Sequence, residues 1–140
     1  FITSYHWESN IRQSLNYIIE NTEEITGHKD AEIRIMAHSA GAAIVAQIAW
    51  EYPEITQILL VNPATKLGID KIQYGLSEIG GSKITVLFGS EDPSVGDVDE
   101  ISKLSEAKNV HTHILEGVDH NFSAKSLEAF IAAPSLYLFD

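Results

Sequence analysis

Residues 33–45 read Ile33-Arg34-Ile35-Met36-Ala37-His38-Ser39-Ala40-Gly41-Ala42-Ala43-Ile44-Val45. A short apolar run ends at one serine, and a segment of small residues typical of a helix follows directly. This order predicts a strand, a sharp turn and a helix, with Ser39 in the turn. The backbone of such a turn is strained, so only small residues, here Ala37 and Gly41, fit two positions before and after the serine. The alternative interpretation is that Ser39 is only the N-cap of an ordinary helix.

The length and charge of the chain restrict its organisation and its partners. Its 140 residues are expected to form a single domain, 1–140, because a chain of this size buries about two-thirds of its unfolded surface. Lys and Arg total 9 against 20 Asp and Glu, and the net charge of −11 repels nucleic acid and anionic membrane surfaces. We therefore expect no nucleic-acid partner.

The composition also bears on the compartment. The sequence contains no cysteine, which excludes disulfides and thiolate metal sites and favours a cytoplasmic location. No run reaches the roughly 18 apolar residues of a membrane span, and the N-terminus lacks the pattern of a secretory signal. Phe1 in place of Met is typical of a processed product or of an excerpt from a longer protein.

Apolar patterns predict the other elements of the chain. Strands are expected at 32–37, 56–61, 83–88 and 110–115, with the end of another at 1–5. Helices are expected at 7–24, 40–51, 97–108 and 123–132, with one or two short ones between 64 and 81. Gly27 and Pro53 suit helix ends, and Pro134 is expected to stop the last helix before an unassigned apolar tail.

The alternation of strands and helices predicts a doubly wound α/β sheet with parallel strands. Four consecutive apolar residues in 58–61 suit a strand buried on both faces, whereas the polar alternation of 110–115 suits an edge strand. In such a sheet the functional loops lie at the C-terminal ends of the strands. The candidate chemistry is therefore sought in these loops.

A serine hydroxyl is a weak nucleophile at neutral pH. It needs a base in contact with it, and the base needs an acceptor that fixes its tautomer and stabilises its cation. Asp92 follows the strand predicted at 83–88, and His120 follows the one at 110–115. Both residues are therefore expected on the same rim of the sheet as Ser39.

The three segments that carry these residues resemble the active-site motifs of the α/β-hydrolase family. Ala37-His38-Ser39-Ala40-Gly41 resembles the nucleophile elbow G-x-S-x-G, with Ala37 in place of the first glycine. Residues 89–93, Gly-Ser-Glu-Asp-Pro, resemble the G-x-x-D turn after the seventh strand of the family. Residues 117–122, Gly-Val-Asp-His-Asn-Phe, resemble the G-x-x-H-x-F loop after the eighth. The chain order Ser, Asp, His is also that of the family.

The resemblance implies an α/β-hydrolase-type, mostly parallel sheet with helices on both faces that lacks the N-terminal strands. Helix 7–24 would match the second helix of the family, and residues 1–5 the end of its fourth strand. The chain would then cover the C-terminal half to two-thirds of the usual fold. Tyr5-His6-Trp7 faintly resembles the Y-D-W of lecithin-acyltransferase-like lipases, with His6 in place of Asp. The N–H of Ala40 would be one half of the oxyanion hole, whose other half comes from a loop after the third strand.

Several residues compete with these assignments or have simpler interpretations. Asp92 could be only a turn former, and the alternatives for the acid are Glu91, Asp97 and Asp99. His38 is expected to point away from the serine hydroxyl and to pack or hydrogen-bond behind the turn. His111 and His113 share a strand face at a spacing that suits a metal, but no third ligand lies near them in sequence, so we expect no metal. His6 and His28 are interpreted as loop or cap residues.

The function implied by the resemblance is that of a serine hydrolase of esterase or lipase type. Ser39 would attack a carboxylic ester or related acyl carbonyl, His120 would move the proton, and Asp92 would orient His120. The expected partner is a small-molecule acyl substrate, and no cofactor is needed. The alternative is a catalytically inactive hydrolase-like interaction domain, or an incomplete fragment of a lipase or acyltransferase.

The missing third strand would leave the strand of Ser39 at an edge of the sheet. Ile33 to Ala37 would then be an apolar edge, and only the charged side chains of Glu32 and Arg34 would oppose its pairing with another strand. We therefore expect that the chain does not work as a lone monomer. Either a preceding segment or a second copy of the chain is expected to cover this edge.

Overall fold

Four parallel strands form one sheet, in the order β1-β2-β3-β4, in the computed structural model, which describes residues 4–104 and 110–139. The strands are β1 (Ile33–His38), β2 (Ile55–Val61), β3 (Lys83–Gly89) and β4 (Val110–Leu115). Each strand pairs with the next one along the chain, and every pair is parallel. The predicted sheet is confirmed, including the edge position of 110–115.

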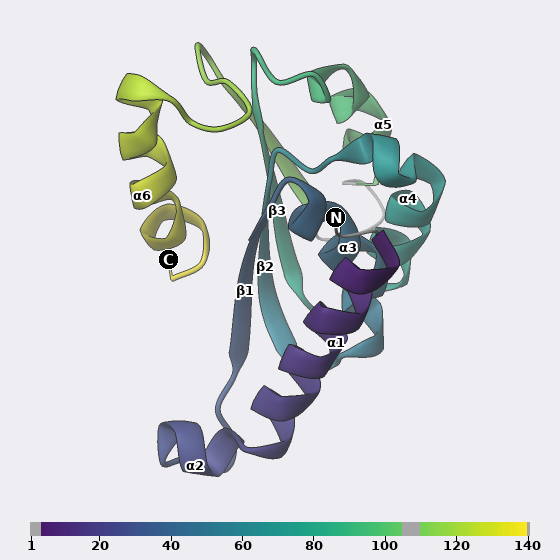
Figure 1. Cartoon of the computed structure of the whole chain (residues 1–140), viewed down its shortest axis with the longest axis vertical. Helices are drawn as coiled ribbons and strands as arrows, with labels where there is room; N and C mark the ends of the chain where they lie inside the picture. Colours follow the sequence, from purple (N-terminus) through teal and green to yellow (C-terminus); the bar gives the residue numbers. More distant parts are fainter. Residues whose placement is uncertain (1–3, 105–109, 140) are drawn as a thin grey trace.

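Helices cover both faces of this sheet (Figure 1). The α-helices of the described residues are α1 (Ser4–Glu20), α2 (Thr22–Thr26), α3 (Ala40–Ile48), α4 (Ile69–Glu78), α5 (Val98–Ser102) and α6 (Leu127–Tyr137). In Figure 1, α1, α3, α4 and α5 lie on one side of the sheet and α6 on the other. Short 3₁₀ turns precede or extend several of them, at 49–51, 65–67, 95–97 and 124–126.

The larger core lies between the sheet and the layer of α1, α3 and α4. Alanines give α3 a narrow profile, and α4 approaches it closely at Gly75. A Cβ atom on Gly75 would lie 2.2 Å from the carbonyl oxygen of Ala46, so only glycine fits this contact. Alternate residues of β2 and β3, such as Leu60 and Val86, complete this core.

The smaller core lies between the opposite face of the sheet and α6. Leu59, Val61 and Leu87 point to this side and pack with Ala133 and Leu138. Arg34 of β1 donates a hydrogen bond to the carbonyl oxygen of Leu138 and lies 5.1 Å from the ring centre of Phe139. The C-terminal tail, which the sequence left unassigned, is therefore held against the sheet.

The N-terminal region differs from the prediction. The expected strand at 1–5 is wrong where it can be compared, because Ser4 and Tyr5 begin α1, while residues 1–3 lie outside the described residues. The expected helix 7–24 is divided at Asn21, whose side-chain amide hydrogen-bonds the carbonyl of Tyr17 at 2.8 Å. Such a bond competes with the helical pattern of the main chain. Gly27 ends α2 in a left-handed conformation, φ 79°, as expected for a helix stop.

Two later helices also differ from the prediction. The helix expected at 97–108 is the short α5, which ends at Ser102, and residues 105–109 lie outside the described residues. Pro134 does not stop the last helix, because α6 continues through it to Tyr137. The N–H of Leu138 bonds the carbonyl of Pro134 at 2.8 Å, so the helical pattern resumes directly after the proline.

Within the described residues, β1 pairs with β2 alone and forms one edge of the sheet. A groove of about 330 Å³ runs beside this edge, between β1 and α1. Its lining is mostly apolar and consists of Trp7, Ile11, Ser14, Leu15, Ile18, Ile35, Met36, Ala37, Gly41 and Val45. No helix of the described ranges has the length and apolarity that a membrane crossing requires.

Candidate active site

Ser39 lies in the sharp turn that joins β1 to α3. Its φ is 58° and its ψ is −120°, a conformation that few residues with a Cβ atom adopt. Its N–H bonds the carbonyl of Val61 at 3.0 Å, while its own carbonyl accepts the N–H groups of Ala43 and Ala64. The side chain makes no hydrogen bond to the start of α3. The interpretation of Ser39 as an ordinary N-cap is therefore wrong, and its hydroxyl is free to face another partner.

The sequence predicts small residues two positions before and after Ser39. A Cβ atom on Gly41 would meet no atom within 4 Å beyond its chain neighbours and the backbone of its own helix, so alanine, which is also small, fits this position. Gly41 lines the apolar groove beside β1, and this groove provides the space. Ala37, two residues before the serine, packs against the larger core.

Asp92 lies in the turn that follows β3, and only 3% of its surface is exposed. One carboxylate oxygen accepts the main-chain N–H of Ser94 at 2.8 Å, and the other accepts a hydrogen bond from Nδ1 of His120. The turn is packed tightly on the loop after β4. A Cβ atom on Gly89 would lie 2.2 Å from the carbonyl oxygen of Val118, so glycine is required at this contact.

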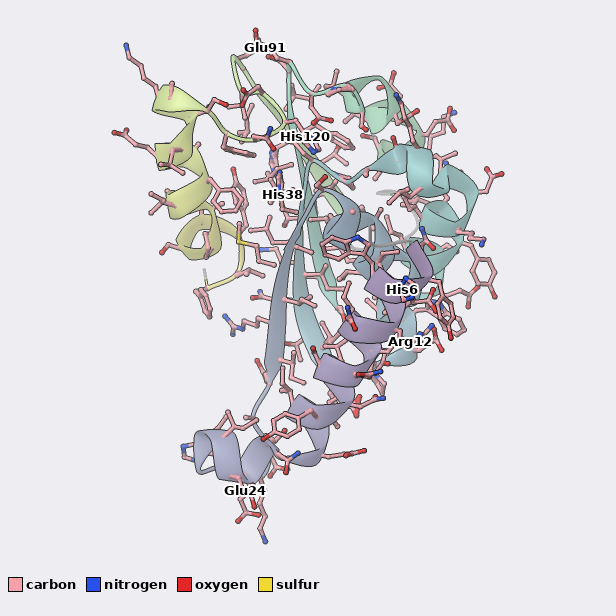
Figure 2. All side chains as sticks on the ribbon, viewed as in Figure 1. His6, Arg12, Glu24, His38, Glu91 and His120 are labelled. Carbon is pink, nitrogen blue, oxygen red and sulfur yellow. The ribbon has the colours of Figure 1, made fainter. Side chains whose placement is uncertain are left out.

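His120 comes from the loop after β4, and its Nε2 lies 2.7 Å from Oγ of Ser39. Figure 2 shows His120 at the carboxyl ends of the strands, beside His38. Because an ionised carboxylate can only accept, Nδ1 of His120 carries the hydrogen that faces Asp92. In the neutral ring Nε2 is then the acceptor, and it is directed at the hydroxyl of Ser39.

A turn directly after His120 closes this loop. The main-chain N–H of Ser123 lies 2.8 Å from Oδ1 of Asp119 and lowers the pKa of that carboxyl below its ordinary value. Phe122 and Ala124 both have positive φ angles, 53° and 52°. His120 therefore lies on an irregular segment, whose position no helix or strand of its own fixes.

The structure brings Ser39, His120 and Asp92 into one hydrogen-bonded line, and the other candidate acids lie elsewhere. Asp97 accepts the hydroxyl hydrogen of Thr65. Glu91 lies at the outer tip of its loop (Figure 2), and Asp99 lies in the first turn of α5.

The other histidines have separate environments. Nε2 of His38 lies 2.7 Å from the main-chain oxygen of His120, and its ring packs against Phe122 and Phe130. His38 thus makes a hydrogen bond and packs, as expected, but it does so on the loop that carries His120, with 5.2 Å between the centres of the two histidine rings. His113 stacks on Tyr137 with 5.5 Å between ring centres. Among the described residues, no group of three or more metal-ligating side chains occurs.

Ala40 is the first residue of α3, next to Ser39. The N–H groups of the first helical turn have no partner within the helix and attract negative charge. The N–H of Ala40 can therefore stabilise an anion that forms at a carbonyl attacked by Ser39. Its role as an oxyanion donor stays a prediction.

Sequence reasoning missed Asn62, which follows β2 and is completely buried. Its side-chain amide donates to the carbonyls of Asp119 and His120, at 3.1 Å each, and accepts the N–H of Gly89 at 2.8 Å. In the sequence, Asn62 could have been noticed as a polar residue directly after a strand that is predicted to be buried on both faces.

No protein-family model matches the sequence, and no curated protein matches it significantly. Solved structures do match. A predicted CIB-like hydrolase from Thermoplasma acidophilum has a TM-score of 0.65 at 23% identity, over 96% of this chain and 59% of its own. The esterase domain of a Rhodothermus marinus protein has a TM-score of 0.65 at 14% identity, over 92% of this chain and 66% of its own.

Est1E from Butyrivibrio proteoclasticus has a TM-score of 0.71 at 14% identity, over 96% of this chain and 69% of its own. At such identities the similarity concerns the fold alone. The chain therefore has part of the α/β-hydrolase fold, as its resemblance to the motifs implied, and spans about six-tenths to seven-tenths of these three structures.

Proposed function

We propose that this chain carries the catalytic centre of a serine hydrolase that cleaves a carboxylic ester or a related acyl bond through an acyl-enzyme. The observation that carries the proposal is the hydrogen-bonded line from Oγ of Ser39 through His120 to the buried Asp92. The hydrolases and esterases that share the fold support the same reaction class.

In the first half-reaction, Oγ of Ser39 attacks the carbonyl carbon while Nε2 of His120 takes the hydroxyl proton. Asp92 holds Nδ1–H and stabilises the imidazolium that forms. The tetrahedral intermediate collapses when His120 gives the proton to the leaving oxygen. The alcohol departs, and the acyl group stays on Ser39.

In the second half-reaction, water replaces the alcohol. His120 takes a proton from the water, whose oxygen attacks the acyl carbon, and the same proton then returns to Oγ of Ser39 as the carboxylic acid leaves. The N–H of Ala40 donates a hydrogen bond to the developing oxyanion in both halves. One such donor contributes roughly 10²–10³ in rate in a related type of site.

The elements around the site favour an open binding region and a small or medium acyl substrate. Only a 3₁₀ turn and α4 connect β2 to β3, and α4 packs on α3 through Gly75. This connection therefore supplies no lid over Ser39. The second oxyanion donor and the cover for the edge at β1 are proposed to come from a preceding segment or a second copy.

A fluorophosphonate probe tests the proposal, because it reacts with an activated serine and leaves ordinary hydroxyls unmodified. Mass spectrometry should locate the label on Ser39, and Ser39→Ala should abolish it. Ser77→Ala is the matched control, since Ser77 is a half-buried serine of α4 whose hydroxyl bonds the carbonyl of Tyr74. A panel of acyl esters with graded chain lengths would then identify the preferred acyl group.

The alternative function is a catalytically inactive interaction domain. The only oxyanion donor proposed among the described residues is the N–H of Ala40, and a hole with a single donor favours this alternative. Failure of the full-length protein to react with the probe would select it over the hydrolase.

A further inference from the structure

Asn62 is a completely buried polar residue that the proposed reaction steps do not use. It follows β2, the strand between those that carry Ser39 and Asp92. Its φ is 44°, in the left-handed region, which Asn adopts more readily than most residues with a Cβ atom. Its main-chain N–H bonds the carbonyl of Leu87 at 2.8 Å, so the backbone is fixed to β3.

The side-chain amide of Asn62 joins two loops of the site. Nδ2 donates to the carbonyl oxygens of Asp119 and His120, and Oδ1 accepts the N–H of Gly89. Carbonyl oxygens can only accept and an N–H can only donate, so this arrangement fixes which end of the amide faces which loop. Both ends of the amide are engaged.

His38 provides a second donor to the same carbonyl of His120, at 2.7 Å. Since a carbonyl oxygen accepts, Nε2 of His38 must carry the hydrogen. The oxygen of His120 is thus held by side chains at the ends of β1 and β2. The ends of β1 and β2 lie side by side, because His38 is paired with Val61, the residue before Asn62.

We propose that Asn62, assisted by His38, is a positioning residue for the base of the proposed hydrolase. His120 must place one ring nitrogen on Ser39 and the other on Asp92, yet it lies on an irregular loop with a third of its side chain exposed. The hydrogen bonds from Asn62 and His38 hold the main chain of residues 119–120 in place. The position of the His120 ring depends on that main chain. A displacement of about 1 Å at a catalytic group costs on the order of 10²-fold in rate.

The chemistry of the site requires an amide at position 62. A carboxylate has no hydrogen to donate, so Asn62→Asp would direct oxygen lone pairs at two carbonyl oxygens without changing the size of the side chain. The loop should move, and the contact between His120 and Asp92 should weaken. With a weaker contact, Asp92 would stabilise less the imidazolium that forms on His120 during the proposed reaction.

The test compares full-length Asn62→Asp with the parent and with Ser82→Ala. Ser82 bonds the carbonyl of Ile55 at the far end of the sheet, so its loss is a matched control for a broken side-chain contact. Asn62→Asp should lower kcat about 10²-fold with KM unchanged. Ser82→Ala should change neither kcat nor KM.

A second readout does not depend on turnover. The proton between Nδ1 of His120 and Asp92 should give a downfield NMR signal that Asn62→Asp weakens or shifts. If the parent proves inactive, the proposed function fails, while this signal still decides the inference. Unchanged kcat and an unchanged signal in Asn62→Asp would overturn it.

A second pair of variants decides the inference if Asn62→Asp does not fold. His38→Phe keeps an aromatic ring against Phe122 and Phe130 but removes the donor, whereas His38→Gln keeps a donor. His38→Phe should reproduce the loss of kcat with KM unchanged, and His38→Gln should restore much of kcat. Equal activity in the two variants would show that packing alone matters and would overturn the inference.

Discussion

The left-handed backbone of Ser39 costs on the order of 1–3 kcal/mol. Three main-chain hydrogen bonds oppose this cost: Ser39 N–H to Val61, and Ala43 and Ala64 to the carbonyl of Ser39. Each contributes about 0.5–1.5 kcal/mol net, so together they offset the strain. The conformation therefore depends on the main chain, and the hydroxyl contributes little to stability.

Ser39→Ala should therefore separate activity from stability. Alanine keeps the Cβ atom and the same strain, so the free energy of unfolding should change by less than about 0.5 kcal/mol. Probe labelling and ester hydrolysis should be lost. Denaturant unfolding and a labelling assay measure the two quantities, and turnover at the parent rate would refute Ser39 as the nucleophile.

Asp92→Asn should lower kcat by about 10⁴, the magnitude known for the same change in another triad enzyme. The N–H of Ser94 holds the amide oxygen, so the amide NH₂ faces Nδ1 of His120. His120 must then carry its hydrogen on Nε2, where it can no longer accept the proton of Ser39. Asp97→Asn, which changes only the contact with Thr65, is the control and should keep the parent rate. The reverse pattern would make Asp97 the acid.

The site residues differ in how readily the sequence reveals them. Ser39, Asp92 and His120 each follow a strand and lie in a short recognisable motif. The partners of Asn62 lie 27, 57 and 58 residues away, and the carbonyl that His38 contacts lies 82 residues away. Contacts of that range depend on strand order and register, which no local pattern specifies.

At the scale of elements, the four strands of the sheet were predictable, but the strand expected at 1–5 and several helix boundaries were wrong. β2 and β3 carry continuous apolar runs, whereas Pro134 lies inside α6 against the usual rule. Proline in a helix costs roughly 3 kcal/mol, but burying a side chain such as Leu138 contributes about 1.5–3 kcal/mol. Leu138 and Ala133 are buried against the sheet, so tertiary packing outweighs the local preference.

The contact of α3 with α4 leads to a prediction about stability. Gly75→Ala should lower the free energy of unfolding by at least 1–3 kcal/mol, roughly the cost of overpacking, because the new Cβ meets main-chain atoms that cannot rotate away. The gain in helix propensity, about 1 kcal/mol, is smaller. Gly41→Ala is the control, since its Cβ has open space and should be neutral or stabilising. Equal unfolding midpoints of Gly75→Ala and the parent would show that α3 and α4 can move apart without a loss of stability.

At the scale of the whole molecule, an apolar groove lies beside one edge strand of the sheet. β1 has a free edge among the described residues, and the groove beside it is lined by α1 and β1. An unpaired apolar edge is a site for pairing with another strand. The opposite edge, β4, is more polar, with exposed His111 and His113.

The 140-residue chain by itself should therefore associate and have impaired esterase activity. Light scattering should give a mass above that of one chain. Ile18→Lys, which puts a charge at the rim of the groove, should weaken the association, whereas Ile131→Lys on α6 should not. A fully active monomer with an uncovered β1 would contradict this prediction.

The order of the strands along the chain also determines when the proposed active site can form during synthesis. Each new strand adds to the edge left by the previous one, so the sheet can grow in step with the ribosome. Ser39 nevertheless precedes His120, its proposed base, by 81 residues, an interval of roughly 4–16 s at ordinary translation rates of about 5–20 residues per second. On the proposed mechanism, a product that terminates before His120 carries Ser39 without its base and should not cleave esters.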